Sequence, residues 1–219
     1  MKTIIAVNAS PRTGWNTAQL VGEAAKGAES AGCRVITVNL YHLDKFSGCV
    51  SCFGCKRGER QGVCVCRDGL TETLEAIRNA DGLIVGSPIY FGNLTAGFRA
   101  FFERLLFQYV TYCPEAPSSN PHRIPTLLIA DSGCPESGYA AAGYDKMLED
   151  YCRIFESILG PTNLLISSDT LQVPDYSKYH WTLFDPAAKQ QRHAEVFPED
   201  LKKAFSAGAA LLNGIKIHL

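Results

Sequence analysis

The chain alternates short apolar runs with segments of helical periodicity, and this alternation constrains its fold more than any other feature of the sequence. A strand that is buried on both faces of a parallel sheet is continuously apolar, and a helix usually connects it to the next parallel strand. The pattern therefore predicts a doubly wound α/β domain with a five-stranded parallel sheet. The predicted strands cover residues 3–7, 34–40, 82–86, 126–130 and 163–167, and the predicted helices cover about 15–30, 70–79, 95–109, 140–159 and 198–213.

Two segments do not fit this alternating frame. One is a cysteine loop at residues 47–68, between the second strand and the second helix, and the other is an aromatic stretch at about 173–197. Within this stretch, we interpret Tyr176, Tyr179, His180, Trp181 and Phe184 as an aromatic, loop-like segment. No internal repeat is visible, so a single domain over residues 1–219 with two insertions is the simplest organisation.

The charge of the chain limits the partners that it can have. Its formal net charge is −1, which gives no electrostatic footprint for nucleic acid or for an anionic membrane. No apolar run reaches the ~18 residues that a membrane-spanning helix needs. The N-terminal apolar run is too short for a signal peptide and is better interpreted as a buried strand, so we expect a cytoplasmic protein.

The turn after the first predicted strand has the features of a phosphate-binding loop. Ser10, Thr13, Asn16 and Thr17 offer hydrogen bonds, Arg12 offers paired charge-assisted bonds, and backbone N–H groups point out of the following helix. The chain has neither of the glycine-rich fingerprints of dinucleotide and nucleoside triphosphate sites, so a monophosphate is the expected ligand. The alternative interpretation is an ordinary capped helix start with a surface arginine.

A second loop, residues 87–93, follows the third predicted strand at its carboxyl end, where ligands bind in open α/β sheets. Pro88 fixes the turn, and Gly92 lets the backbone approach a flat ligand closely. Tyr90 and Phe91 can cover the face of an aromatic ring. If this loop stood alone, a turn with two core aromatic residues would explain the same sequence.

These loops also carry a family resemblance. SPRTGWNT followed by ADGLIVGSPIYFGNLTAGFRAFFER resembles the NADPH-dependent FMN reductase group of flavodoxin-fold proteins, over most of residues 1 to about 160. The expected strand order is the flavodoxin-like 2-1-3-4-5. The resemblance implies that the phosphate of FMN lies on Ser10, Arg12, Asn16 and Thr17. It implies an isoalloxazine ring against Pro88, Ile89, Tyr90, Phe91, Gly92 and Asn93. A third flavin loop at 131–138 is expected to contribute Gly133 and Cys134.

The cysteine loop has the spacing of a metal site. Cys49, Cys52 and Cys55 are spaced C-x2-C-x2-C, and Cys64 and Cys66 follow as C-x-C after a polar stretch. Three thiolates with the first spacing can hold three corners of a [4Fe–4S] cluster. We expect Cys64 to be the fourth ligand, because Cys66 adjoins the start of the next predicted helix.

The loop resembles that of the iron-sulfur flavoproteins, with one departure. In those proteins the fourth cysteine usually follows the third at a shorter spacing than the eight intervening residues present here. A zinc site made from four of the five thiols is a chemical alternative. A second alternative is a loop that binds no metal, as in flavin reductases that carry a similar cysteine-containing loop.

The resemblance implies an FMN-dependent NAD(P)H oxidoreductase that passes electrons to a soluble acceptor, directly or through the cluster. FMN carries the hydride and electron chemistry itself, so we assign no catalytic residue. NAD(P)H is expected as a transient electron donor, because no second nucleotide fingerprint is present. Two other classes fit the same motifs: a non-enzymatic electron carrier that accepts electrons from a ferredoxin-like partner, and a redox or metal sensor.

The helix predicted at 95–109 bears on the oligomeric state. Together with the residues that follow it, up to Tyr112, this helix carries apolar side chains on more than one face. A helix that packs against its own core on one side needs only one apolar face. We therefore expect a homodimer or homotetramer. The alternative is a deeply buried helix in a monomer.

Overall fold

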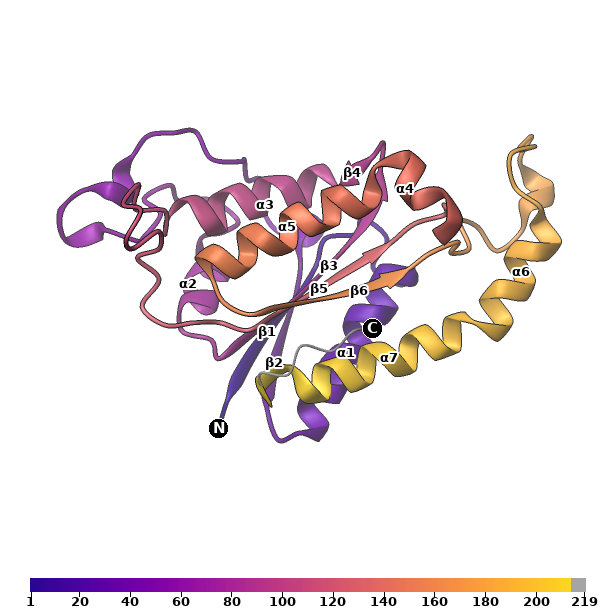
Figure 1. The fold of residues 1–219 in the computed structure, drawn as a ribbon, viewed down its shortest axis with the longest axis horizontal. Coiled ribbons are helices and arrows are strands. Elements are labelled where there is room, and N and C mark those ends of the chain that lie inside the picture. Colours follow the sequence, from indigo (N-terminus) through magenta and orange to yellow (C-terminus); the bar gives the residue numbers. More distant parts are fainter. Residues whose placement is uncertain (214–219) are drawn as a thin grey trace.

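Five parallel strands form the centre of the structure, a computed structural model in which residues 1–213 are described (Figure 1). The strands are β1 (Thr3–Asn8), β2 (Arg34–Asn39), β3 (Gly82–Tyr90), β5 (Thr126–Asp131) and β6 (Thr162–Ser167). Their order across the sheet is β2-β1-β3-β5-β6, so the predicted doubly wound, flavodoxin-like topology is confirmed. A short β4 (Asn93–Leu94) pairs antiparallel with the end of β3.

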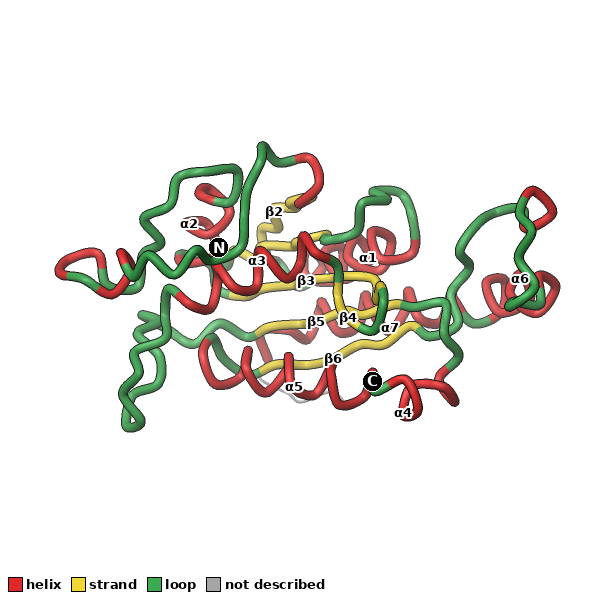
Figure 2. Tube along the Cα trace, turned by 90° about the horizontal axis from the view of Figure 1, so that it is seen from above, coloured by secondary structure: helices red, strands yellow, loops and turns green. Residues whose placement is uncertain are grey.

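Helices cover both faces of this sheet (Figure 2). On one face lie α1 (Asn16–Ser30) and α7 (Phe197–Ala210). On the other face lie α2 (Thr71–Arg78), α3 (Ala96–Phe107) and α5 (Tyr144–Ile158). The central strands β1, β3 and β5 are buried by both helical layers, and their continuously apolar sequences follow from this position.

An aromatic cluster joins α3 to α5 on the second face. Phe98 and Phe102 of α3 meet the rings of Tyr151 and Phe155 of α5 edge to face, and the closest pair, Phe102 and Tyr151, has ring centroids 4.8 Å apart. Such edge-to-face contacts stabilise a pair beyond the area that it buries. The two helices are thereby held in a fixed relation.

On the first face, glycine permits a close approach of α1 and α7. A Cβ atom on Gly208 would lie 1.8 Å from the backbone oxygen of Ala24, and one on Gly27 would lie 1.9 Å from the backbone oxygen of Phe205. Contacts this short do not occur, so a larger residue at either position requires a helix to move. The last helix is therefore seated directly on the first.

Two expectations drawn from the sequence are wrong about where elements end. β3 does not stop at residue 86 but continues to Tyr90, so the first half of the predicted ring loop is strand. Phe91 and Gly92 then form its turn, with φ angles of 50° and 79°. The helix predicted over 140–159 is broken at Gly143, which has a φ of 72°, into a short α4 (Tyr139–Ala142) and α5.

The insertion at about 173–197 contains a helix that the sequence analysis did not predict. α6 (Pro186–Glu195) is capped by Asp185, whose carboxylate accepts hydrogen bonds from the backbone N–H groups of Ala187 and Ala188. Pro186 suits the first turn because its fixed φ is helical and it lacks an N–H that would be unpaired there. The residues interpreted as loop-like, 176–184, lie before this helix, and apart from the single 3-10 turn Tyr176–Lys178 they form neither helix nor strand.

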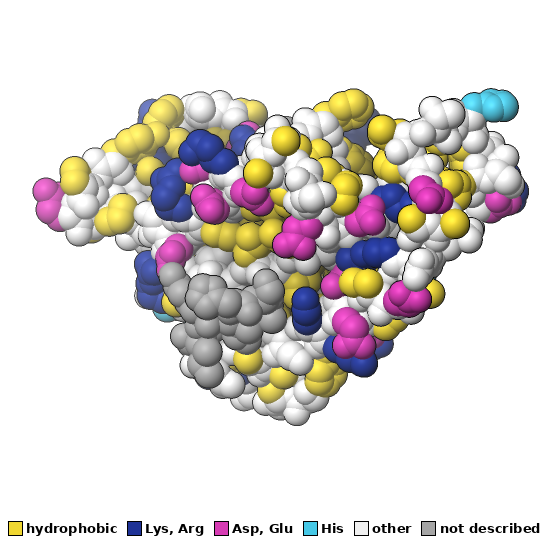
Figure 3. Space-filling view, turned by 45° about the vertical axis from the view of Figure 1, so that its right-hand side comes forward, with side chains coloured by type: hydrophobic (Ala, Val, Ile, Leu, Met, Phe, Trp, Pro, Cys, Tyr) yellow, Lys and Arg dark blue, Asp and Glu magenta, His cyan; other side chains and the backbone are white. Residues whose placement is uncertain are grey.

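The two insertions extend from opposite ends of the sheet (Figure 1). The cysteine loop lies beside the C-terminal end of α3, whereas α6 lies beyond the carboxyl ends of the strands. On the face drawn in Figure 3, basic and acidic side chains are interspersed and do not separate by sign. Among residues 1–213, every helix is too short or too polar to cross a bilayer.

Candidate functional site

A pocket opens at the carboxyl ends of β1, β3 and β5, beside the first turn of α1. Its walls come from the loop after β1, the ends of β3 and β5, and the segment after β6. With its open mouth it encloses about 400 Å³. The lining residues are Ser10, Arg12, Trp15, Asn16, Thr17, Pro88, Ile89, Tyr90, Asp131, Ser132, Gly133, Thr170, Leu171 and Gln172.

The loop after β1 is fixed by its own contacts. The backbone N–H of Ser10 donates to the side-chain oxygen of Asn8 at 3.1 Å, and the backbone N–H of Arg12 donates to the hydroxyl of Ser10 at 3.1 Å. The guanidinium of Arg12 lies over the indole of Trp15, 4.0 Å from the ring centroid. Arg12 is thus held at the pocket by contacts within its own loop.

Three side chains at the start of α1 direct donors at one short segment of backbone. Arg12 donates to the carbonyl oxygen of Gln172 at 2.6 Å, and Trp15 Nε1 and Asn16 Nδ2 both donate to the carbonyl oxygen of Leu171 at 2.9 Å. Trp15 occupies the N-cap position but offers the helix no side-chain acceptor. The first turn of α1 therefore presents side-chain and backbone donors together, which is the arrangement that an anion at a helix N-terminus requires.

One acidic side chain lies inside this pocket. The carboxylate of Asp131 is buried at the end of β5 and accepts a hydrogen bond from the hydroxyl of Thr17. Burial raises the pKa of Asp131 to about 6, although hydrogen bonds from Thr17, Asn16 and Thr170 lower it in part. The charge of the pocket therefore changes in the same pH range in which a phosphate monoester titrates.

A larger cavity continues from this pocket toward the C-terminal insertion. With its open mouth it encloses about 1320 Å³. Both cavities are lined by Ile89, Tyr90, Ser132, Gly133 and Gln172. The walls that belong to the larger cavity alone are mostly apolar and include two carboxylates, and they consist of Cys134, Pro135, Tyr144, Asp169, Leu183, Phe184, Asp185, Ala188 and Lys189.

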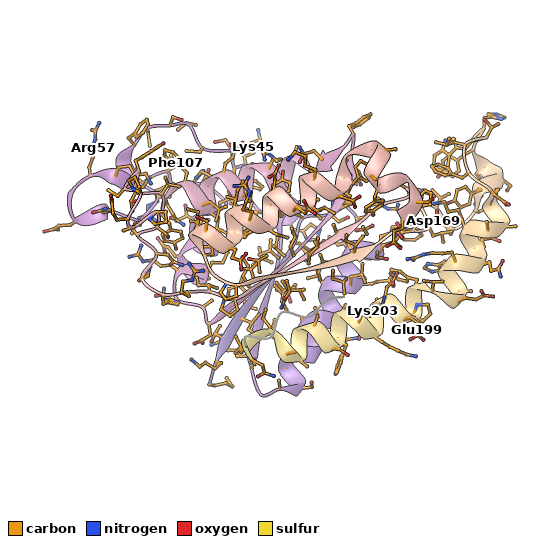
Figure 4. All side chains as sticks on the ribbon, in the orientation of Figure 1. Lys45, Arg57, Phe107, Asp169, Glu199 and Lys203 are labelled. Carbon is orange, nitrogen blue, oxygen red and sulfur yellow. The ribbon has the colours of Figure 1, made fainter. Side chains whose placement is uncertain are left out.

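Lys189 of α6 closes the wall of this larger cavity. The residue is only 4% exposed, and its ammonium group donates to the carbonyl oxygen of Gly133 at 2.6 Å and pairs with the carboxylate of Asp169. The same ammonium lies 5.0 Å from the ring centroid of Phe184. Asp169, labelled in Figure 4, has a φ of 52°, which is uncommon for a residue other than glycine. α6 is thereby anchored to the third predicted flavin loop.

The structure brings most of the predicted flavin residues together. Those that line the first pocket are Ser10, Arg12, Asn16, Thr17, Pro88, Ile89, Tyr90 and Gly133, and Cys134 lines the second. Thr13, Phe91, Gly92 and Asn93 line neither of these two cavities. Phe91 is fully exposed at the β3–β4 turn, and the side-chain oxygen of Asn93 accepts a hydrogen bond from the hydroxyl of Tyr151 at 2.6 Å.

Several pocket residues were missed by the sequence analysis. Trp15 lies inside the phosphate-loop motif, but a tryptophan there gave no signal of a polar role. Asp131 stands at the end of an apolar strand, which is the position where ligand-binding residues gather in such sheets. Thr170, Leu171 and Gln172 reach the pocket from about 155 residues along the chain, through contacts that no local pattern encodes.

A recess at the other end of the molecule gathers the cysteines. All five cysteines of the loop line it: Cys49, Cys52, Cys55, Cys64 and Cys66. The remaining walls include Arg104, Phe107 and Gln108 from the C-terminal end of α3. Figure 4 shows Phe107 and Arg57 at this end and Asp169 at the opposite end.

The recess is held by hydrogen bonds from α3 to the cysteine loop. The Nε of Arg104 donates to Cys64 Sγ at 3.2 Å, and the backbone N–H of Cys64 donates to the side chain of Gln108 at 3.0 Å. The backbone N–H of Cys49 donates to the carboxylate of Glu103 at 3.2 Å. These bonds fix both the first and the fourth cysteine of the motif against the same helix.

The five thiols differ in exposure and acidity. Cys52 is exposed, and the backbone N–H of Gly54 lowers the pKa of its thiol. Cys55 is buried, and burial raises the pKa of its thiol. Ser51 and Phe53, on either side of Cys52, have φ angles of 52° and 55°, so this part of the loop holds a conformation that few non-glycine residues adopt.

The donor set of this recess fits some metal centres better than others. No three His, Cys, Asp or Glu side chains in the described part of the chain are placed to bind one metal ion, so a preformed zinc site is not present there. In a [4Fe–4S] cluster each thiolate binds a different iron, so its ligands surround the cluster and do not converge on one point. The five thiols that line the recess supply the ligand type of such a cluster, although in the described part of the chain they are not drawn together as a metal site.

Known proteins with similar sequences are flavoproteins. The sequence model of the family described as NADPH-dependent FMN reductase matches residues 2–145. An iron-sulfur flavoprotein of Methanosarcina thermophila is 35% identical over 101 residues, which cover 46% of this chain and 51% of that protein. One from Methanocaldococcus jannaschii is 34% identical over 101 residues, covering 46% and 50%. The match spans about half the length of these curated relatives.

Solved structures with the same fold are oxidoreductases. An NAD(P)H:quinone oxidoreductase from Methanothermobacter marburgensis superposes with a TM-score of 0.67 at 16% identity, covering 96% of both chains. An FMN-dependent NADH-azoreductase from Bacillus anthracis, in complex with FMN, superposes with a TM-score of 0.63 at 16% identity, covering 97% of this chain and all of the other. At these identities the likeness concerns the fold alone.

Proposed function

Because this chain belongs to the NADPH-dependent FMN reductase family, we propose that it is a cytoplasmic FMN-dependent NAD(P)H oxidoreductase that passes electrons to a soluble acceptor. The observation that carries the proposal is the convergence of Arg12, Trp15 and Asn16 donors at the N-terminus of α1, beside a cavity at the carboxyl edge of the sheet. When bound, FMN supplies the hydride and electron chemistry. The protein residues bind it, orient it and limit access to it.

The donor set of the first pocket fits the phosphate of FMN. Arg12, Asn16 and the first-turn N–H groups of α1 supply positive charge and donors, and Ser10 and Thr17 supply hydroxyls at the pocket wall, with Thr13 in the same loop but outside that wall. The carbonyl oxygens of Leu171 and Gln172 accept from these donors in the structure, as phosphate oxygens would. Asp131 is the one unfavourable group, and its raised pKa reduces the repulsion because the neutral form is accessible near pH 6.

The larger cavity fits a flat ring and a second aromatic group. Its wall at Ile89 and Tyr90, continued by Pro88 in the first pocket, would support one face of the isoalloxazine ring, with Gly133 and Cys134 at the edge of the ring. The turn formed by Phe91, Gly92 and Asn93 projects beside this wall. The larger cavity is open to solvent on one side, so a nicotinamide ring or an acceptor can approach a bound flavin from there.

The proposal is tested by cofactor titration and steady-state kinetics. We expect about one FMN per chain, oxidation of NADH or NADPH by the loaded protein, and electron transfer to a soluble quinone. Failure to bind FMN contradicts the proposal outright. Stoichiometric FMN without NAD(P)H turnover favours the second candidate, an electron carrier reduced by a ferredoxin-like protein, for which the names of the iron-sulfur flavoprotein relatives are the supporting observation.

We also propose that the cysteine loop binds a [4Fe–4S] cluster through Cys49, Cys52, Cys55 and Cys64. The support is the grouping of the loop's thiols around one recess and the similarity to iron-sulfur flavoproteins. When bound, the cluster stores and releases single electrons. The residues of the recess hold it and control its exposure to solvent.

A homodimer or homotetramer remains part of the proposal. A groove between α3 and α5 is lined by the half-buried apolar residues Val110 and Ile154 over the buried Phe102, Leu106 and Ile158, and the charged residues Glu103 and Arg153 also line it. Such a surface is typical of an interface with another protein. Light scattering tests this point, because a monomer has a mass of 23.9 kDa.

A further inference from the structure

Arg104 is a buried cation at the wall of the thiol recess. The residue lies in the last turn of α3, and its side chain is only 2% exposed. A buried charge is costly unless it is paired and hydrogen-bonded, so each of its contacts needs an explanation. The ion pair with Asp68, at 2.7 Å, balances the positive charge of Arg104. It does not explain why the other N–H groups of the guanidinium point toward the cysteine loop.

The remaining donors of Arg104 reach both ends of the cysteine loop. Nε donates to Cys64 Sγ at 3.2 Å, Nη1 donates to the carbonyl oxygen of Ser47 at 3.2 Å, and Nη2 donates to the carbonyl oxygen of Cys66 at 3.2 Å. Of the two cysteines in the C-x-C pair, Arg104 therefore contacts Cys64 through its sulfur and Cys66 through its backbone. The planar guanidinium can make these contacts together because its donors form a rigid fork.

This difference in contacts distinguishes Cys64 from Cys66, which the sequence alone leaves as alternative candidates for the fourth cluster ligand. The sulfur of Cys64 accepts a hydrogen bond directly from the Arg104 cation, whereas the thiol of Cys66 lies within reach of the same charge but is hydrogen-bonded to Cys52. A cationic donor stabilises a thiolate ligand more than a neutral environment does. It also stabilises the reduced form of an iron-sulfur centre, because the added electron increases the negative charge on the sulfurs.

We propose that Arg104 is a positioning residue that selects Cys64 over Cys66 as the fourth cluster ligand and raises the reduction potential of the cluster. The inference rests on the proposed [4Fe–4S] site. It predicts two separate effects of removing the N–H···S bond: the potential becomes more negative, and the preference for Cys64 weakens.

The test variant must not leave a buried carboxylate unpaired. We therefore choose the double variant Arg104→Gln/Asp68→Asn, which removes one positive and one negative charge and so keeps the net charge of the recess. Asp68→Asn alone is the matched control, because it breaks the ion pair and leaves the N–H···S bond in place. Arg67→Gln is a second control, because Arg67 is an exposed neighbour that pairs with Glu75.

Each full-length protein is reconstituted anaerobically with iron and sulfide, and the potential is measured by a redox titration followed by electron paramagnetic resonance. We expect a more negative potential in the double variant than in the parent and in both controls. Cys64→Ser should lose the cluster and Cys66→Ser should keep it in the parent background. In the double-variant background the iron contents of these two serine variants should become more alike.

The outcomes separate this inference from the cluster proposal. An unchanged potential and an unchanged Cys64 preference in a double variant with full iron content mean that Arg104 only supports the fold, which overturns the inference alone. A parent protein that takes up no iron overturns the cluster and the inference together. If the double variant does not fold, Arg104→Met/Asp68→Leu replaces it, because two apolar side chains remove the N–H···S bond and the ion pair together and leave no buried charge unpaired. A potential and a Cys64 preference equal to those of the parent then overturn the inference.

Discussion

The hydroxyl of Thr17 donates a hydrogen bond to the carboxylate of Asp131, and this bond ties the first turn of α1 to the carboxyl end of β5. Thr17 belongs to the predicted phosphate loop, whereas Asp131 begins the third predicted flavin loop. The contact therefore joins two of the three loops before any ligand binds. It also places an ionisable acid where the proposed ligand carries its own negative charge.

The first prediction concerns the pH dependence of FMN binding. Asp131 has a pKa of about 6, above its usual value of 3.8, so lowering the pH from 8 to 6 progressively neutralises it in the free protein. FMN affinity should rise over this interval, by at most about tenfold per pH unit for one linked proton. In Asp131→Asn the affinity at pH 8 should be higher and the slope smaller, as measured by fluorescence titration.

Riboflavin is the matched ligand for this prediction, because it lacks the phosphate. Its binding should depend much less on pH in the parent protein. An identical pH slope for FMN in the parent and in Asp131→Asn would show that the phosphate titrates alone and that Asp131 has no part in it.

The second prediction concerns Arg12. Its guanidinium is already held at the pocket by Trp15, so it would meet the phosphate without much reorganisation. Arg12→Ala should weaken FMN binding by about 1.5–3 kcal/mol, the scale of a hydrogen bond to a charged group. Arg34→Ala, at the opposite end of the sheet, is the control and should bind FMN as the parent does. If Arg12→Ala binds FMN as tightly as the parent does, the assignment of this loop to the phosphate of FMN is wrong.

The third prediction concerns the packing of α1 on α7. In Gly208→Ala the new methyl group would meet the backbone of Ala24, which no rotamer change can relieve, so the free energy of unfolding should fall by about 1–3 kcal/mol. Gly22→Ala lies in the same helix pair with nothing within 4 Å of its new Cβ. It should leave stability unchanged or increase it by up to about 1 kcal/mol. Urea denaturation compares the three proteins, and equal midpoints for Gly208→Ala and the parent contradict the packing argument.

The fourth prediction concerns the metal content of the cysteine loop. After anaerobic reconstitution the parent should contain about four irons per chain, and Cys52→Ser should lose most of them, because it removes one of the three thiolates of the C-x2-C-x2-C run that hold three corners of the cluster. Cys33→Ser is the control, since Cys33 packs against the core on the α1–α7 face, away from the recess. Equal iron in Cys52→Ser and Cys33→Ser would show that the iron is bound elsewhere.

The frame of the fold was predictable because it rests on local signals. The central strands β1, β3 and β5 are buried on both faces and are therefore apolar throughout, and the alternation of apolar runs with helical segments located the two edge strands as well. The order of the strands was expected from the flavodoxin-like frame. The break at Gly143 was less accessible, since glycine in a helical pattern is often tolerated and only its φ of 72° shows that it ends a helix. α6 was missed although Asp185 and Pro186 form a recognisable helix start, because aromatic residues before them dominated the interpretation.

The candidate site was predictable only in part, for a different reason. Ser10, Arg12 and Tyr90 lie in loops whose position after a strand indicates their role. The contacts of Arg12 with Gln172, and of Arg104 with Cys64, join segments that are distant in the sequence. Pairing of this kind is fixed by tertiary packing, and no spacing rule in a single sequence encodes it.

The opposite placement of the two insertions has a consequence for how such a chain can change over time. The sheet and its two helical layers form the core of the domain. The cysteine loop and the insertion that contains α6 lie at separate ends of this core. A replacement of residues 47–68 by a plain turn would leave the walls of the cavity beside α6 as they are. Either insertion can therefore be gained, lost or replaced by itself, because no compensating substitution is required at the other end of the domain.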